Sequence, residues 1–144
     1  MAVTLRAAMA ADEKNIRALI HEAGINPMNL DWERFLVAEG DGVFAGCGQL
    51  KPHGDGAVEL ASLAVIADRQ GTGVGSMLVR ALIERGPREL YLMCRSGLAP
   101  YYRRFGFEEI GPEAMPRSFK TIYRAARLAG QQGLSIMRRV GAAS

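Results

Sequence analysis

A glycine-rich stretch, RQGTGVG at positions 69–75, carries the clearest chemical signal in the sequence. It lies between an apolar run and a helix-like run, so it should join a strand to the first turn of a helix. The first N–H groups of a helix have no acceptor within the helix, and the helix dipole adds partial positive charge there. Glycines at 71, 73 and 75 remove side chains that would hold a ligand away. The stretch therefore predicts a phosphate cradle of main-chain N–H groups; the alternative is a glycine turn without a ligand.

Two common phosphate-binding loops do not fit this stretch. A P-loop needs a lysine followed by serine or threonine after its last glycine, and no lysine follows here. A dinucleotide fingerprint needs a third glycine where this chain has Ser76, although small residues are tolerated there. That fingerprint also follows the first strand of its fold, with an acid about 20 residues on. Here several elements precede the loop, and the next strand ends in Cys94 and Arg95.

Around the loop, the apolar pattern predicts a mixed succession of strands and helices. Strands are expected at 3–8, 35–39, 43–51, 57–65, 89–94, 107–110 and 134–140, and helices at 12–23, 74–85, 98–105 and over part of 116–129. Asp41-Gly42 is typical of a tight hairpin turn. Hairpins followed by a strand–helix–strand unit favour an α+β fold with a mostly antiparallel sheet and one parallel crossover. Without repeats or linkers, residues 1–144 are expected to form a single domain.

Composition places the chain among ordinary globular proteins, with 49% apolar and 23% charged residues. No apolar run is long enough to cross a membrane, and the N-terminus has no signal-peptide pattern. A net charge of +3 favours anionic ligands but is too small to indicate nucleic acid. Cys47 and Cys94 form no CxxC pair and lie in apolar runs, so we interpret them as reduced core residues of a cytoplasmic protein.

The loop and its surroundings resemble the GNAT superfamily of N-acetyltransferases. That family's acetyl-CoA motif, Q/R-x-x-G-x-G/A, is matched at each fixed position by QGTGVG at 70–75. VELASLAV at 58–65 resembles the family's fourth strand, YYRRFGFEEI at 101–110 its late helix-and-strand signature, and LSIMRRV at 134–140 its last strand. VFAGCGQL at 43–50 is similar to small amino-acid acetyltransferases of the glutamate-acetylating kind. Those relatives often carry an arginine where this chain has Ala61, which weakens that narrower similarity.

The resemblance implies a GNAT fold, with flanking helices and a parallel pair of strands that splay apart. It also implies acetyl-CoA as cofactor. The expected cofactor-binding residues are Leu63, Ala64 and Val65 on the fourth strand, where a main-chain N–H would polarise the thioester carbonyl, and Gln70, Gly71, Thr72, Gly73, Val74, Gly75 and Ser76 of the loop. Arg69 and either Arg103 or Arg104 could add contacts to phosphate, or the latter two could lie on a solvated helix face.

Glu59 is the candidate general base, because it is the only acid in the run AVELASLAV. Strand alternation would put Glu59, Ala61, Leu63 and Val65 on one face. A carboxylate among such neighbours should have a raised pKa, which suits a base that works near neutral pH, directly or through water. The resemblance agrees, since several family members carry a glutamate at this place. The alternative is a glutamate at the start of a strand that faces solvent.

Tyr102 takes the tyrosine position of the family signature, which implies a general acid that protonates the departing thiolate. The alternative is a core tyrosine packed under the cofactor. The neighbouring Tyr101 should point about 100° away around a helix. We interpret His21 and His53 as surface residues, because neither has a partner with metal or triad spacing. No metal site and no covalent intermediate on Cys94 are expected.

The sequence does not identify the molecule that accepts the acetyl group. One hypothesis is direct acetyl transfer to a primary amine of a small molecule or amino acid. A second is a protein acetyltransferase that acts on lysine or an N-terminus, and a third is a non-catalytic acyl-CoA-binding module. Glu59 and Tyr102 together argue against the third. The resemblance implies that the acceptor binds beside the loop that joins the first two helices. In this chain that segment is GINPMNLDW, at 24–32. No nucleic-acid or membrane partner is expected, and a homodimer is left open.

Overall fold

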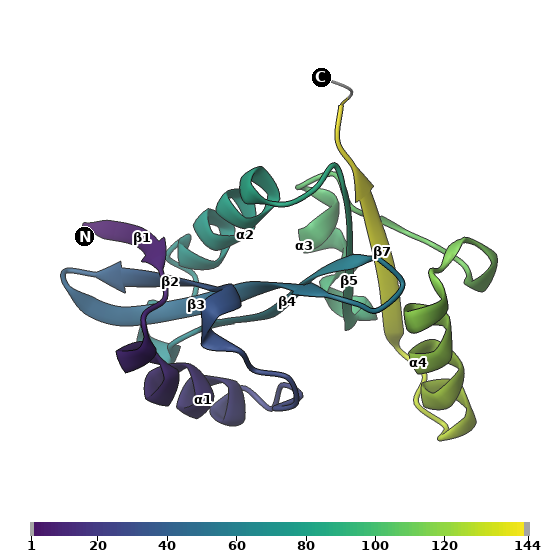
Figure 1. Ribbon diagram of the computed structural model, residues 1–144, viewed down its shortest axis with the longest axis horizontal. Coiled ribbons are helices and arrows are strands. Elements are labelled where there is room, and N and C mark those ends of the chain that lie inside the picture. The colour runs from purple at the N-terminus through teal and green to yellow at the C-terminus, as the bar shows by residue number, and fades with distance from the viewer. Residues whose placement is uncertain (1, 143–144) are drawn as a thin grey trace. The chain divides into compact units, whose positions relative to one another are not determined.

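A computed structural model describes residues 2–142 of the chain (Figure 1). The strands in this range are β1 (Val3–Ala7), β2 (Phe35–Gly40), β3 (Val43–Pro52), β4 (Val58–Val65), β5 (Glu89–Arg95), β6 (Glu108–Glu109) and β7 (Leu134–Val140). The α-helices in it are α1 (Glu13–Glu22), α2 (Val74–Arg85), α3 (Ala99–Arg103) and α4 (Arg117–Leu128).

The strands form a mixed sheet in the order β1-β2-β3-β4-β5-β7-β6. The β1–β2, β2–β3, β5–β7 and β6–β7 pairs are antiparallel, whereas β4 and β5 run parallel, with Glu59 opposite Tyr91. The helix between these two parallel strands is α2, as a parallel crossover requires. The predicted α+β class and the single parallel pair are therefore confirmed.

The described residues fold as two compact units. One consists of the chain up to Leu50 together with Leu60–Arg85, and the other of Lys51–Glu59 together with the chain from Gly86 onward. The change of unit falls inside β4, between Glu59 and Leu60. The single domain expected over 1–144 stays a prediction.

In the first unit, α1 and α2 cover opposite faces of β1–β3 (Figure 1). On the α1 face, Ile16 and Ile20 pack with Val37 and Cys47. On the α2 face, β3 carries Gly46 and Gly48, where an added Cβ would lie only 3.3 Å from Leu78 Cδ1 and 2.9 Å from Leu82 Cδ1, respectively. At Gly46 the added Cβ would also lie 2.8 Å from the main-chain O of Ala64 on β4, so the neighbouring strand, as well as α2, requires glycine there.

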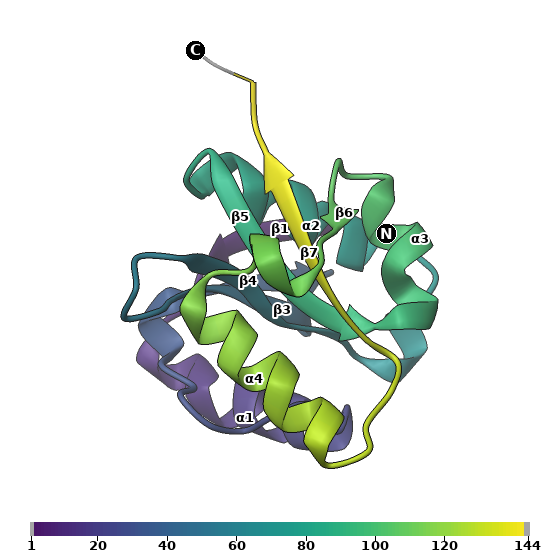
Figure 2. The same ribbon diagram turned by 90° about the vertical axis from the view of Figure 1, so that its right-hand side faces the viewer.

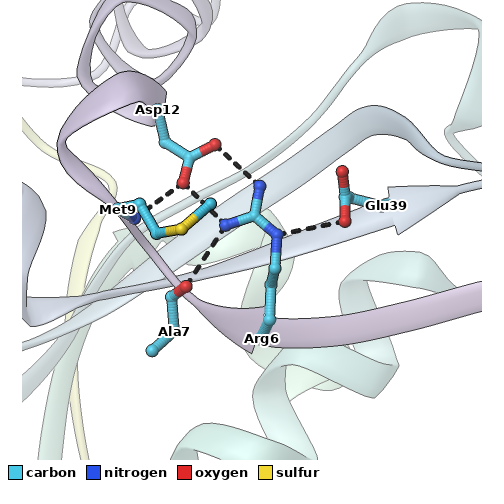
Figure 3. Close-up of polar contacts among 5 residues, drawn as sticks. All are labelled: Arg6, Ala7, Met9, Asp12 and Glu39. Carbon is cyan, nitrogen blue, oxygen red and sulfur yellow. Dashed lines mark hydrogen bonds and ion pairs between the residues drawn. The ribbon is translucent and has the colours of Figure 1, made fainter.

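A partly buried ion pair joins β1 to the start of α1 (Figure 3). Arg6 donates from Nη1 and Nη2 to the carboxylate of Asp12, at 2.7 and 2.8 Å, and from Nε to Glu39 on β2 at 3.0 Å. Asp12 also accepts from the main-chain N–H of Met9 at 2.7 Å. The hydrogen bonds from Arg6 hold the pKa of Asp12 below its usual value. Asp12 was expected to be the first residue of the helix. In the structure it lies just before α1 and holds this part of the chain against β1.

In the second unit, α3 and α4 lie on opposite sides of β5 and β7 (Figures 1 and 2). On the α4 side, the fully buried Phe119 packs against Tyr91 and Ile136. Phe119 is the one buried residue that α4 contributes, and full burial of such a side chain is worth roughly 1.5–3 kcal/mol. The position of α4 therefore depends strongly on this ring.

Most predicted elements are confirmed to within two residues. The helix expected at 98–105 begins as a 3₁₀ turn at Ser96–Leu98, and α3 itself ends at Arg103. The strand expected at 107–110 is reduced to Glu108–Glu109, and α4 is continuous where only part of 116–129 was expected to be helical. Cys47 and Cys94 are buried and free, as predicted. Among the described residues, no helix is long and apolar enough to cross a membrane.

Candidate active site

The glycine loop has the backbone geometry that its sequence predicts. After a 3₁₀ turn at Ala67–Arg69, Gly71 and Gly73 adopt positive φ values of 79° and 92°. These angles are costly for residues with a Cβ, which explains glycine at both places. A Cβ added at either glycine would meet no atom within 4 Å, so both face open space. A ligand can therefore approach the main chain here without meeting a side chain.

The first turn of α2 follows this loop directly. Met77 N–H donates to Gly73 O at 3.1 Å, so helical hydrogen bonding begins at Gly73. The N–H groups before Met77 belong to the turn that has no acceptor within the helix. Val74 is buried in the core, so only its main chain can face a ligand. Gly75 and Ser76 are half-buried and lie within α2 rather than in the loop.

The polar side chains of the loop brace the loop itself. Gln70 Nε2 donates to Val65 O at 3.1 Å, and Thr72 Oγ1 donates to Arg69 O. Arg69 also forms an ion pair with Asp41 across 3.9 Å. Gln70 thus fastens the loop to the end of β4. These hydrogen bonds within the loop explain in part why Gln70 and Thr72 occur in the motif, apart from any direct contact that they make with a cofactor.

Strand β4 is irregular just before the residues expected to polarise a carbonyl. Ser62 adopts a φ of 56°, which is uncommon for a residue with a side chain and interrupts regular alternation. The alternation from which Glu59 and Leu63 were expected to share one face is therefore interrupted between them. Sequence reasoning also missed Gln49, a fully buried residue that donates from Nε2 to Ser62 Oγ at 2.9 Å. Within the described residues, the Oε1 atom of Gln49 has no hydrogen-bond partner.

Glu59 is buried, and it has a partner that the sequence reasoning did not assign. Glu59 Oε1 lies 2.8 Å from His53 Nε2, and the two side chains are only 8% and 11% exposed, respectively. The interpretation of His53 as a surface residue is therefore wrong. Its ring also packs on Phe119, with the ring centroids 4.8 Å apart. The solvent-facing alternative for Glu59 is excluded by the same geometry, whereas His21 is exposed as expected.

Tyr102 lies on α3 in the core of the second unit and is 9% exposed. Its ring meets Tyr101 and Phe107 edge-on, at centroid distances of 5.1 and 6.3 Å. Burial, with smaller contributions from Cys94 and Tyr101, raises the pKa of Tyr102 to about 12. Its hydroxyl therefore keeps its proton throughout the neutral range. Tyr101 is half-buried and its ring is turned toward Arg104 and Phe105, as the helical offset predicts.

The arginines of α3 have partners of their own. Arg103 donates to Glu109 at 2.7 Å, and both side chains are about half exposed. The guanidinium of Arg104 lies 5.5 Å from the centroid of the Tyr101 ring. These contacts favour the solvated-face interpretation of both residues over a phosphate contact. No cluster of metal-binding residues occurs in the described part of the chain.

A match to one protein family covers the residues of this candidate site. Residues 31–109, more than half of the chain, match the family described as Acetyltransferase (GNAT) domain. The chain belongs to the GNAT family. The resemblance drawn from the loop and strands is thus confirmed, as is the expectation of an acetyl-CoA-dependent N-acetyltransferase fold and family.

Curated GNAT relatives are distant and longer than this chain. An amino-acid acetyltransferase of Vibrio vulnificus is 29% identical over 100 residues, which cover 66% of this chain but only 22% of the relative. The chain therefore spans less than a quarter of the length of the curated relatives it matches.

Solved GNAT structures agree with the fold along nearly the whole chain. The N-acetylglutamate synthase of Neisseria gonorrhoeae, solved with coenzyme A and N-acetyl-glutamate, gives a TM-score of 0.79 at 23% identity over 99% of this chain and 36% of that one. The ribosomal-protein-S18-alanine N-acetyltransferase of Escherichia coli gives 0.70 at 21% identity, over 99% and 97% of the two chains. At such identities the likeness establishes the fold alone.

Proposed function

We propose that this GNAT chain transfers the acetyl group of acetyl-CoA directly to a primary amine of a small molecule or amino acid. The observation that carries the proposal is the buried carboxylate of Glu59, which His53 holds at 2.8 Å on the strand where the family resemblance puts a base. The distant similarity to an amino-acid acetyltransferase supports the class of acceptor.

The glycine loop is proposed to hold the cofactor by its phosphates. When bound, acetyl-CoA supplies an acetyl group activated as a thioester. The residues proposed to bind it are Leu63, Ala64 and Val65 on β4, and Gln70, Gly71, Thr72, Gly73, Val74, Gly75 and Ser76 of the loop and α2. Open space beside Gly71 and Gly73, at the N-terminus of α2, fits a phosphate group. The irregular φ of Ser62 supports a main-chain N–H donor among the next three residues, since it breaks the regular pattern of the strand.

Glu59 is proposed as the general base. An amine is protonated near neutral pH and cannot attack a carbonyl until it loses a proton. The Glu59 carboxylate takes this proton, directly or through a water molecule, and so frees the lone pair of the nitrogen. Its burial excludes bulk water and strengthens its attraction for the ammonium group.

Tyr102 is proposed as the general acid. Its hydroxyl keeps its proton, because burial raises its pKa to about 12. Tyr102 can therefore donate it to a sulfur leaving group as negative charge develops there.

A panel assay of thiol release tests the class of acceptor. The purified chain is incubated with acetyl-CoA and separately with amino acids, simple amines, and peptides that carry a free N-terminus or lysine. The proposal expects amine-dependent thiol release and an acetylated product with at least one small amine. Acetylation of peptides alone would replace it with a protein acetyltransferase. Coenzyme A binding without release from any member would indicate a binding module.

A further inference from the structure

The hairpin segment between β3 and β4, residues 53–57, is held in place both by its own hydrogen bonds and by a contact with α4. It is closed by hydrogen bonds from His53 N–H to Ala57 O at 2.8 Å and from Gly56 N–H to His53 O at 3.0 Å. The carboxylate of Asp55 accepts from Ala57 N–H at 3.1 Å and from Ser118 N–H of α4 at 3.0 Å. The hairpin is thus fixed to the first turn of α4 within the second unit.

This arrangement encloses the imidazole of His53 between a carboxylate and an aromatic ring. Glu59 Oε1 lies at one nitrogen, and Phe119 of α4, itself fully buried, packs against the ring with centroids 4.8 Å apart. The interplanar angle of 41° is that of a tilted packing contact. With one face packed and one nitrogen bonded, the orientation of the imidazole is fixed. A surface histidine would have neither constraint.

The chemistry of the pair indicates which atom carries the proton. An ionised carboxylate can only accept hydrogen bonds, so His53 must donate through Nε2–H when Glu59 is ready to act as a base. The contact with His53 engages one of the two carboxylate oxygens, Oε1. Asp55 is a second negative charge near His53, and its carboxylate accepts hydrogen bonds from two main-chain N–H groups.

We propose that His53 is the positioning residue for Glu59, with Nε2–H holding Oε1 so that Oε2 faces the acceptor amine. This inference rests on the function proposed above. In the step, the proton leaves the ammonium nitrogen of the acceptor and binds Oε2, while the N–H electron pair becomes the nucleophilic lone pair. The Nε2–H bond of His53 stays intact, so His53 orients the base and does not carry the proton. The role is comparable to that of a group that orients a catalytic base in a triad.

Two substitutions separate the donor of His53 from its ring. His53→Gln keeps an N–H donor at the corresponding place and loses the ring, whereas His53→Phe keeps a ring against Phe119 and loses the donor. Loss of a hydrogen bond to a charged group should lower kcat roughly 10- to 100-fold in His53→Phe. His53→Gln should retain most of the activity and the same pH–rate profile. His21→Gln, on the exposed face of α1, is the matched control and should behave as the unchanged protein.

Other patterns would overturn the proposal. If both variants are fully active, His53 does not position the base. If both lose activity equally, an N–H donor at this place is not sufficient, and a property that only the imidazole has, such as a titrating proton, would replace the positioning role. Loss in His53→Gln alone would assign the effect to ring packing. Melting curves for each variant show whether a loss of activity reflects unfolding.

A measurement on the unchanged protein covers the case in which a variant does not fold. Ring ¹⁵N shifts of His53 at neutral pH should report protonation at Nε2, and the Nδ1–H tautomer would overturn the proposal. The NMR result is independent of catalysis. A fully active Glu59→Gln variant beside an intact Nε2–H signal would therefore refute the proposed base while leaving the His53–Glu59 contact in place.

Discussion

Asp55 and Ser118 are 63 residues apart in the sequence, yet the carboxylate of Asp55 accepts a hydrogen bond from the main-chain N–H of Ser118 at 3.0 Å. This bond joins the hairpin that carries His53 to the helix that carries Phe119. It satisfies one of the N–H groups in the first turn of α4, where negative charge is favoured. Hydrogen bonds from Ser118 and Ala57 lower the pKa of Asp55 to about 2.

Asp55→Asn should therefore destabilise the protein in a pH-dependent way. Because the folded-state pKa lies below the ordinary value of 3.8, the charge of Asp55 stabilises the fold above pH 3.8, and this contribution is lost as the pH falls toward about 2. The side chain is exposed, so the expected cost at neutral pH is under about 1 kcal/mol. Melting temperatures of both proteins across the acid range should differ at neutral pH and converge near pH 2. A constant difference would contradict this account.

The glycine loop should be required for coenzyme A binding. Gly73 has a positive φ, so a substitution there would strain the backbone as well as block the loop. Gly75 lies within α2 and is the cleaner test. Gly75→Val would put a branched side chain beside the first-turn N–H groups, and we expect an affinity loss of at least 10-fold with little change in melting temperature. Calorimetric titration with coenzyme A measures this, and Gly54→Val, in the exposed hairpin, is the control. Unchanged affinity in the Gly75 variant would remove the cradle.

Tyr102→Phe should lower kcat by roughly 10- to 10³-fold, within the lower range of acid–base effects. Because burial raises the pKa of Tyr102 to about 12, its deprotonation lies above the working range. The loss should therefore be nearly the same at every pH between about 6 and 9. The variant keeps the ring contacts with Tyr101 and Phe107. Steady-state rates across this range, with acetyl-CoA saturating, measure the effect.

Tyr101→Phe is the control for this substitution, since its ring is half-buried and turned toward Arg104. It should retain normal kcat. A large loss of kcat in Tyr101→Phe, together with a normal kcat in Tyr102→Phe, would show that Tyr101 and not Tyr102 is the acid. Normal rates in both variants would mean that water protonates the leaving group.

Local backbone chemistry made much of the fold predictable. Asp41 and Gly42 have φ values of 52° and 78°, as their sequence predicts for a tight hairpin turn, and Gly71 and Gly73 adopt the positive φ that only glycine takes easily. The helical stripe of α2 likewise buries Val74, Leu78 and Leu82. Each of these features is determined within a few residues, which is why pattern and propensity suffice.

Features fixed by distant parts of the chain could not be read in this way. The segment PHGDG is typical of an exposed turn, and nothing near His53 in the sequence indicates that Phe119 covers its ring. The positive φ of Ser62 has no local signature, since serine rarely adopts it. The buried pair of Glu59 and His53 is six residues apart and spans a hairpin, so no periodic pattern predicts it. The sequence pattern thus named the candidate residues, whereas the contacts that hold them depend on distant parts of the chain.

The most direct test of the account is the rate of acetyl transfer by Glu59→Gln with the best acceptor from the amine panel. The substitution keeps the shape of the side chain and an acceptor for His53, and removes only its basicity. We predict a fall in kcat of roughly 10²–10⁴-fold, the usual worth of general acid–base catalysis, with unchanged affinity for coenzyme A. Glu22→Gln, at the exposed end of α1, should have no effect. An unchanged kcat and pH–rate profile in Glu59→Gln would contradict the assignment of Glu59 as the base.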